Sequence, residues 1–150
     1  MRLLGVDPGS AAGGWALLAV EGDRAQLLAS GSFTGWQAVA DWRALLPIEA
    51  AVIEDVHVAP KQGLVSAGKL MWAKGCAEGG LQGLGVPGVV LIPPARWKAS
   101  MGLPGGLGGK AVAMMLAQRL LGVTLVEHQA EAALLAWAAY KLGLVPCGNP

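Results

Sequence analysis

Acidic side chains stand at two places in the sequence where they could hold a metal ion. Asp7 directly precedes the turn sequence Pro8-Gly9-Ser10, although an aspartate there can also simply cap the turn. Glu54 lies in a β-rich segment in which alternation puts its side chain on the same face as Val52 and Val56. An unpaired carboxylate on a buried apolar face costs several kcal/mol. Glu54 therefore needs a positive partner, of which a metal ion is one.

A histidine and a third acid lie near the start of a C-terminal helix. His128 and Glu131 are three positions apart and therefore project from the same helix face. The residues that follow are apolar almost all round, which predicts that the helix is buried. Two polar groups on one side of such a helix are either an internal pair or ligands. Glu127 could reach the same place, but it more simply favours the helix N-terminus through the macrodipole.

Three carboxylates and one imidazole make a ligand set for divalent cations: Asp7, Glu54, Glu131 and His128. Negative charges gathered in one place repel one another, and divalent cations relieve that repulsion. Oxygen ligands suit Mg²⁺ or Mn²⁺, and an imidazole moves the preference toward Mn²⁺. Two such ions about 4 Å apart can activate water and stabilise the leaving oxygen of a phosphodiester. The set predicts phosphodiester hydrolysis, whereas Asp55 points to the opposite face and is expected to be solvated or structural.

Secondary-structure patterns place these residues on a mixed sheet. Strands are predicted where short β-rich runs end at turn residues: Leu3–Val6, Trp15–Val20, Ala25–Phe33, Ala51–Val58 and Val86–Ile92. Helices are predicted from apolar periodicity over Trp36–Leu46, Gly63–Glu78, Lys110–Leu121 and His128–Leu142, with a mobile loop over Met101–Gly109. The first three strands suggest an antiparallel meander. Three consecutive strands followed by helices that alternate with strands predict an α/β fold, with helices on the faces of a mixed sheet.

Composition limits the class of protein. The 150 residues fit one domain over residues 1–150, and 54% of them are hydrophobic, which is enough to form a core. The longest charge-free run, residues 79–95, holds five glycines and three prolines and is therefore no candidate for a membrane span. The N-terminus reaches Asp7 before any stretch of signal-peptide length, and Cys76 and Cys147 form no metal or disulfide pattern. We therefore expect a soluble cytoplasmic protein.

Charge is distributed unevenly along the chain. Residues 1–60 carry three basic and seven acidic side chains, whereas residues 61–119 carry seven basic and one acidic. A basic middle segment favours a polyanionic partner, although it could equally be a solvated surface. Trp97, between Arg96 and Lys98, is a candidate for stacking on bases. The other five tryptophans are expected to be core or dimer contacts. Met114 and Met115 are expected to pack their helix against its neighbours.

The order and content of these motifs resemble the RuvC family of Holliday-junction resolvases. The opening segments Leu4–Ser10 and Gly14–Leu18 carry the strongest similarity, and Glu54 resembles the second acid of the family. Pro94–Gln118 and His128–Ala136 resemble the basic loop and the final acidic helix. This resemblance implies the RNase H-like fold, a five-stranded mixed sheet with helices on both faces.

The resemblance also implies roles for individual residues. Asp7, Glu54 and Glu131 match three of the four metal-binding acids, and His128 stands where the common pattern has Asp and some relatives have His. Lys98 and Lys110 resemble two lysines that contact DNA phosphates. Arg96 lies beside them, and His57 stands where relatives have an aromatic residue that wedges against unstacked junction bases.

These correspondences imply a structure-selective endonuclease that cuts four-way DNA junctions symmetrically with two Mg²⁺ or Mn²⁺ ions. Paired cutting requires a homodimer, for which the segment 63–78 offers a stripe of Leu64, Gly68, Met71 and Trp72. Gly68 and Gly75 suggest close approach by another backbone. The alternatives are a related nuclease acting on other branched DNA or on RNA/DNA, a non-catalytic nucleic-acid-binding module, and an actin-like ATPase, which normally needs two such domains. A phosphate-binding loop before Lys110 is excluded because Pro104 and Ala111 break its pattern.

Overall fold

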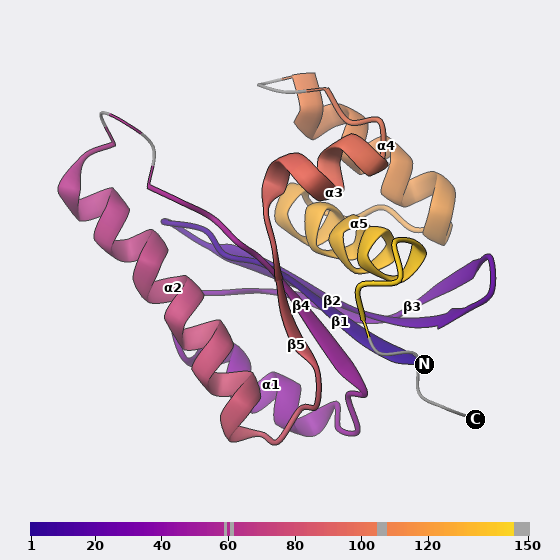
Figure 1. The fold of residues 1–150 in the computed structure, drawn as a ribbon, viewed down its shortest axis with the longest axis horizontal. Helices are drawn as coiled ribbons and strands as arrows, with labels where there is room; N and C mark the ends of the chain where they lie inside the picture. The colour runs from indigo at the N-terminus through magenta and orange to yellow at the C-terminus, as the bar shows by residue number, and fades with distance from the viewer. Residues whose placement is uncertain (59, 61, 105–107, 146–150) are drawn as a thin grey trace.

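A computed structural model describes residues 1–58, 60, 62–104 and 108–145 of the chain. The elements follow the order β1 (Arg2–Asp7), β2 (Gly13–Glu21), β3 (Arg24–Phe33), α1 (Gln37–Ala44), β4 (Ala50–Glu54), α2 (Leu64–Gly83), β5 (Val89–Ile92), α3 (Pro94–Ser100), α4 (Gly108–Leu121) and α5 (Glu127–Lys141). Figure 1 shows the helices on the two sides of one twisted sheet, with α1 and α2 on one side and α3, α4 and α5 on the other.

The sheet is five-stranded and mixed, with the strand order β3-β2-β1-β4-β5. β1 pairs antiparallel with β2 and parallel with β4, so it is the central strand on which both halves of the sheet meet. β2 and β3 pair antiparallel, and β4 and β5 pair parallel. The predicted meander of three strands and the mixed α/β sheet are both confirmed.

A separate hydrophobic cluster lies on each face of the sheet. Alternate residues of β1 supply both clusters, because Leu3 faces the side of α5 while Leu4 and Val6 face the side of α1 and α2. The α5 side is filled mainly by alanines of that helix, and the other side by larger side chains that include Trp42 and Leu81. Small side chains on α5 let this helix lie close to the sheet.

Several predicted boundaries were wrong. The fourth strand ends at Glu54 instead of Val58, β5 begins at Val89, and α2 continues to Gly83. The largest difference is α3, which begins at Pro94 where the sequence predicts only the end of a strand. Proline also fits the first turn of a helix, where its missing N–H would have no partner in any case. The predicted loop over residues 101–109 is shorter, since α4 begins at Gly108, and residues 105–107 lie outside the described part.

Some predicted packing roles were also wrong. Met115 is 48% exposed on α4, and Met114 is 36% exposed, so neither is a core side chain. A Cβ placed on Gly68 or Gly75 would meet nothing within 4 Å, so no other backbone in the described part of the chain approaches them. Trp15 and Trp42 are confirmed as core residues. Trp137 packs against the cluster on the α5 side and stacks on Tyr140. Trp36 and Trp72 are exposed and so are not core residues, which leaves a dimer contact as the prediction for them.

Candidate metal centre

The two strand-borne carboxylates lie at the same edge of the sheet. Asp7 is the last residue of β1 and Glu54 is the last residue of β4. The two strands are parallel neighbours, and the pairing of Val6 with Ile53 places the next residue of each strand side by side. Both residues are 6% exposed, so the prediction that Glu54 lies on the buried face of its strand is confirmed.

Two glycines bring α5 onto the sheet next to Asp7. A Cβ on Gly5 would lie 2.0 Å from the carbonyl oxygen of Ala132, and one on Gly14 would lie 2.4 Å from the carbonyl carbon of His128. Because Gly5 and Gly14 have no side chain, the backbone of α5 can occupy the space that a Cβ would take. Gly14 is the partner of Asp7 in the β1–β2 register, so this contact places the first turn of α5 directly over the edge of the sheet that carries Asp7 and Glu54.

His128 and Glu131 converge on Asp7 as a result. The Nδ1 atom of His128 lies 2.8 Å from Oδ2 of Asp7. One potential ligand atom from each of Asp7, His128 and Glu131 lies within 4.8 Å of the others. Two carboxylates and an imidazole at this spacing fit a divalent cation such as Mg²⁺ or Mn²⁺.

Glu54 is not one of the three residues whose ligand atoms lie within 4.8 Å of one another, and Lys98 of α3 links it to Glu131. The indole Nε1 of Trp97 donates a hydrogen bond of 2.8 Å to Oε1 of Glu54. The ammonium group of Lys98 lies 3.0 Å from Oε1 of Glu131 and 3.6 Å from Oε1 of Glu54. Lys98 therefore bridges two of the four predicted ligands and neutralises part of their charge.

Electrostatics at this edge are those of a crowded, partly desolvated anionic site. Burial, reinforced by the negative charge of Asp7, raises the pKa of Glu54 from 4.5 to about 7. The hydrogen bond to Asp7 raises the pKa of His128 above its ordinary value. Burial acts to lower the pKa of Lys98, but the charges of Glu54 and Glu131 outweigh it, and the pKa is raised. All three pKa values are raised, so the site favours additional positive charge. A bound divalent cation would supply that charge.

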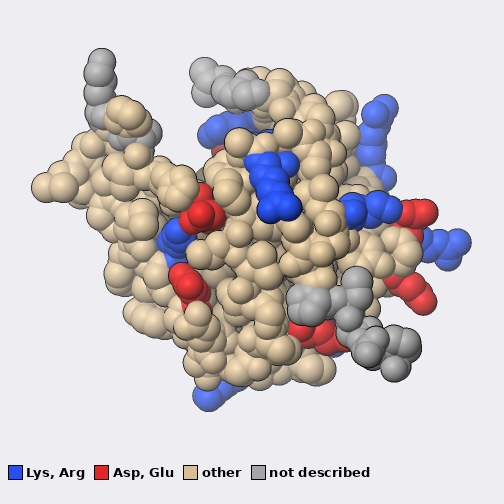
Figure 2. Space-filling view, viewed as in Figure 1, with Lys and Arg blue, Asp and Glu red and all other residues tan. Residues whose placement is uncertain are grey.

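A hollow of about 230 Å³ opens beside these residues. Lys98, Lys110, Glu127, His128 and Glu131 are among the side chains that line it. Lys110 reaches across it from α4, and its ammonium lies 2.6 Å from Oε1 of Glu127. Figure 2 shows basic side chains over the part of the molecule that holds α3, α4 and α5. A phosphate oxygen entering this hollow would meet two ammonium groups at the edge of the acidic cluster.

The other predicted residues lie further from the cluster. Arg96 and His57 are exposed, and neither forms a hydrogen bond or ion pair with the four predicted ligand residues among the described residues. Asp55 is confirmed as a structural acid, because it pairs with Lys74 of α2 and lies 3.7 Å from Nε2 of His57.

The predicted stacking role of Trp97 is wrong. This side chain is 1% exposed, so no base can stack on it without unfolding α3. Its hydrogen bond to Glu54 was missed because the two residues are 43 positions apart. The proline at the start of α3 was the one local signal that could have placed Trp97 and Lys98 on a helix.

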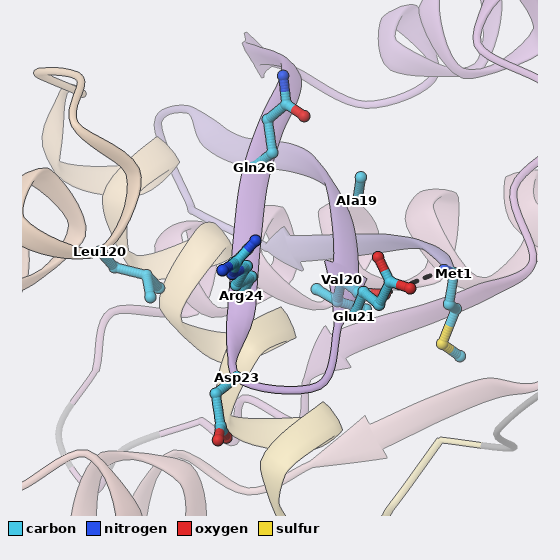
Figure 3. A pocket seen from close by; sticks show the side chains of 9 residues that line it. Met1, Ala19, Val20, Glu21, Asp23, Arg24, Gln26 and Leu120 are labelled. Atoms are coloured by element: carbon cyan, nitrogen blue, oxygen red, sulfur yellow. Dashed lines mark hydrogen bonds between the residues drawn. The ribbon is translucent and has the colours of Figure 1, made fainter.

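A larger hollow of about 680 Å³ lies at the opposite end of β1, around the β2–β3 hairpin. Figure 3 shows Met1, Glu21, Asp23 and Arg24 around it, with the amino group of Met1 hydrogen-bonded to the carbonyl of Val20. Asp23 is paired with Lys141, and no cluster of potential metal ligands lines this hollow within the described residues. Volume alone therefore does not identify the functional site. No helix in the described part has the length and apolar character needed to cross a membrane.

The fold is similar to those of solved resolvases. A structure of Thermus thermophilus RuvC in complex with a Holliday junction substrate aligns with a TM-score of 0.75 at 22% identity, over 97% of this chain and 98% of that one. Another structure of T. thermophilus RuvC aligns over the same shares of both chains, with a TM-score of 0.71 and 23% identity. Fowlpox virus resolvase in complex with Holliday junction DNA aligns with a TM-score of 0.54 and 15% identity, over 93% of this chain and 99% of that one.

The sequence matches no protein-family model and no curated protein. The structural similarity nevertheless confirms the expected α/β, RNase H-like fold with its five-stranded mixed sheet and helices on both faces.

Proposed function

We propose that this protein is a metal-dependent endonuclease that resolves four-way DNA junctions by paired, symmetric cleavage. The observation that carries the proposal is the convergence of Asp7, His128 and Glu131 within 4.8 Å, with Glu54 beside them on the neighbouring strand. This convergence occurs on the fold of a RuvC structure that is described with a Holliday junction substrate. The proposal treats residues 1–150 as one nuclease domain acting on DNA in the cytoplasm.

The residues present fit divalent ions. Asp7, Glu54, Glu131 and His128 would hold one or two Mg²⁺ or Mn²⁺ ions, since the set is rich in oxygen and contains one imidazole. Bound ions of this kind supply an activated water and stabilise the leaving oxygen of a phosphodiester. Without a bound ion, Lys98 joins Glu54 to Glu131 and His128 pairs with Asp7.

Positive groups around the hollow would bind the DNA backbone. Lys98 and Lys110 both line it, so they would contact phosphates without reading bases. Arg96 is exposed on the same helix as Lys98, and His57 is exposed just after β4, which leaves both able to contact a junction arm. These contacts give affinity that depends on the shape of the substrate more than on its sequence.

Paired cleavage requires two active sites, and α2 offers a surface for a symmetric homodimer. Its exposed apolar side chains include Leu64, Met71 and Trp72, which are 89%, 42% and 56% exposed. A contiguous apolar patch on a helix is typical of an interaction surface. At Gly68 and Gly75 a Cβ would meet no described atom of this chain within 4 Å, so a partner helix could come close there.

The test is cleavage of labelled four-way junctions with Mg²⁺ or Mn²⁺, beside duplex DNA and an RNA/DNA hybrid. Asp7→Asn preserves shape and removes charge, so we expect junction binding to persist while cleavage falls roughly 100-fold or more. Asp41→Asn, which changes an exposed acid of α1, is the matched control and is expected to cut like the parent. Equal cutting of the hybrid and the junction would favour the related RNase H-like activity, and full activity of Asp7→Asn would overturn the proposal.

A further inference from the structure

Among the described residues, Trp97 differs from the other two buried tryptophans in what its indole N–H does. The Nε1 atoms of Trp15 and Trp42 are buried without a hydrogen-bond partner, so these two rings act as apolar side chains. The Nε1 atom of Trp97, in a side chain that is only 1% exposed, donates to Oε1 of Glu54 at 2.8 Å. A buried hydrogen bond to a carboxylate is shielded from water, and its donor cannot act as a metal ligand.

The two oxygens of Glu54 are unequal as a consequence. Oε1 accepts the bond from Trp97 and also lies 3.6 Å from the ammonium of Lys98, so both residues of α3 act on the same oxygen. Among the described residues, no hydrogen-bond donor or ammonium group contacts Oε2. Oε2 is therefore the atom through which Glu54 can reach a cation.

The position of α3 makes this arrangement rigid. Ile92 is the register partner of Glu54 in the β4–β5 pair, and the backbone N–H of Asp55 donates to the carbonyl of Ile92 at 2.9 Å. α3 begins at Pro94, two residues after Ile92, so the helix leaves the sheet directly beside the carboxylate. The indole is a planar donor on a short side chain, and its burial leaves it little rotational freedom.

We propose that Trp97 is a positioning residue that holds Glu54 through Oε1 and thereby presents Oε2 to a divalent cation. The inference rests on the metal site of the proposed function and adds a residue outside its ligand set. Partners that orient a metal-binding carboxylate usually change metal affinity by about 10-fold or more when they are removed. Trp97→Phe removes the N–H and keeps most of the buried ring, so Mn²⁺ binding is expected to weaken by about that factor.

The experiment measures Mn²⁺ binding by calorimetry and by the paramagnetic signal of free Mn²⁺, without DNA. Four proteins are compared: the parent, Trp97→Phe, Glu54→Gln and the double variant. If Trp97 acts through Glu54, Trp97→Phe weakens binding about 10-fold in the parent but adds nothing once Glu54 is replaced. Trp42→Phe is the matched control, since it changes a buried indole whose N–H has no partner, and it is expected to bind Mn²⁺ like the parent.

Two outcomes overturn the inference while leaving the proposed function standing: Trp97→Phe binds Mn²⁺ as tightly as the parent, or it weakens binding equally with and without Glu54. A parent that binds no Mn²⁺ would overturn the metal site as well. If Trp97→Phe does not fold, benzothienylalanine at position 97 replaces only the N–H by sulfur, and the same outcomes are read from that protein.

Discussion

His128 and Asp7 are 121 positions apart in the sequence, yet Nδ1 of the imidazole lies 2.8 Å from Oδ2 of the carboxylate. Asp7 is nearly fully buried, whereas the side chain of His128 is 40% exposed, so the pair lies at the mouth of the acidic cluster. The Nδ1 atom of His128 can hold a proton against Asp7 or bind a cation, but not both at once. The pair therefore couples protonation to metal binding.

The first prediction concerns this competition. The hydrogen bond to Asp7 raises the pKa of His128 above its ordinary value of 6.5. The imidazole therefore stays protonated to a higher pH than a free histidine does. Metal ligation needs the neutral ring, and apparent Mn²⁺ affinity should fall roughly tenfold for each pH unit once His128 is protonated. Calorimetric titration with Mn²⁺ at a series of pH values measures how affinity changes with pH. His128→Asp should move the loss of affinity to lower pH and shift the metal preference toward Mg²⁺.

If a His128→Ala protein binds Mn²⁺ and cuts junctions like the parent, the residue is structural and not a ligand.

The second prediction concerns stability without metal. The pKa of Glu54 is raised from 4.5 to about 7, so the native state holds this proton more tightly than the unfolded chain does. Its contribution to stability is fully present below 4.5 and is lost as the pH rises through about 7. The loss is on the order of 3 kcal/mol, at roughly 1.4 kcal/mol for each unit of difference in pKa.

Urea unfolding in the presence of a chelator, at about pH 5 and about pH 8, measures this change. Glu54→Gln should lose most of the dependence because glutamine does not ionise, whereas Glu21→Gln, an exposed control at the end of β2, should keep it. Added Mn²⁺ should restore stability at the higher pH in the parent alone. An identical pH dependence in the parent and Glu54→Gln would contradict the buried environment of this acid.

The third prediction concerns the phosphate contacts. Lys110 lines the hollow beside the cluster, so its removal should weaken junction binding for all sequences and reduce the salt dependence of log K by about one unit of slope. Lys141→Ala is the matched control: it removes the same charge from a lysine that pairs with Asp23 near the β2–β3 hairpin. Fluorescence anisotropy over a salt series measures both slopes, and equal slopes for Lys110→Ala and the parent would exclude a direct contact.

The fourth prediction concerns the homodimer. Met71→Glu places a charge in the exposed apolar face of α2 and should produce monomers that bind junctions weakly and rarely complete the second cut. Met115→Glu makes the same change at a comparably exposed methionine of α4 and should leave association unchanged. Sedimentation velocity at micromolar concentration reports the oligomeric state. A monomeric parent that still makes paired symmetric cuts would rule out the dimer as the working unit.

The fifth prediction concerns the glycine that brings α5 to the sheet. Gly14→Ala would put a Cβ 2.4 Å from the carbonyl carbon of His128, so the helix must move away. We expect a loss of about 1–3 kcal/mol of stability and weaker Mn²⁺ binding, because His128 moves with its helix. Gly83→Ala on α2, where a Cβ meets nothing within 4 Å, should be neutral or slightly stabilising. Urea unfolding compares the two, and a fully stable Gly14→Ala protein would contradict the close contact.

Local pattern was enough to predict much of the sheet and the candidate ligands. Alternation placed Glu54 on a buried face, and three-residue spacing placed His128 and Glu131 together, because strand and helix periods act over a few neighbouring residues. Asp7 and Glu54 could each be singled out in advance because each lies in or directly after an apolar strand pattern. Singling them out needs no knowledge of which strand lies beside which.

Tertiary structure decided how the ligands are held. Trp97 was expected to meet DNA bases, but packing of α3 against the sheet buries its ring and directs its N–H to Glu54, 43 positions earlier. Lys98, expected to contact phosphate, also joins Glu54 to Glu131 across two elements. The sequence alone determined which residues carry charge and which face of their own strand or helix they occupy. Only the folded chain decided their partners, because contacts between distant elements depend on strand order and on the close approach that Gly5 and Gly14 allow.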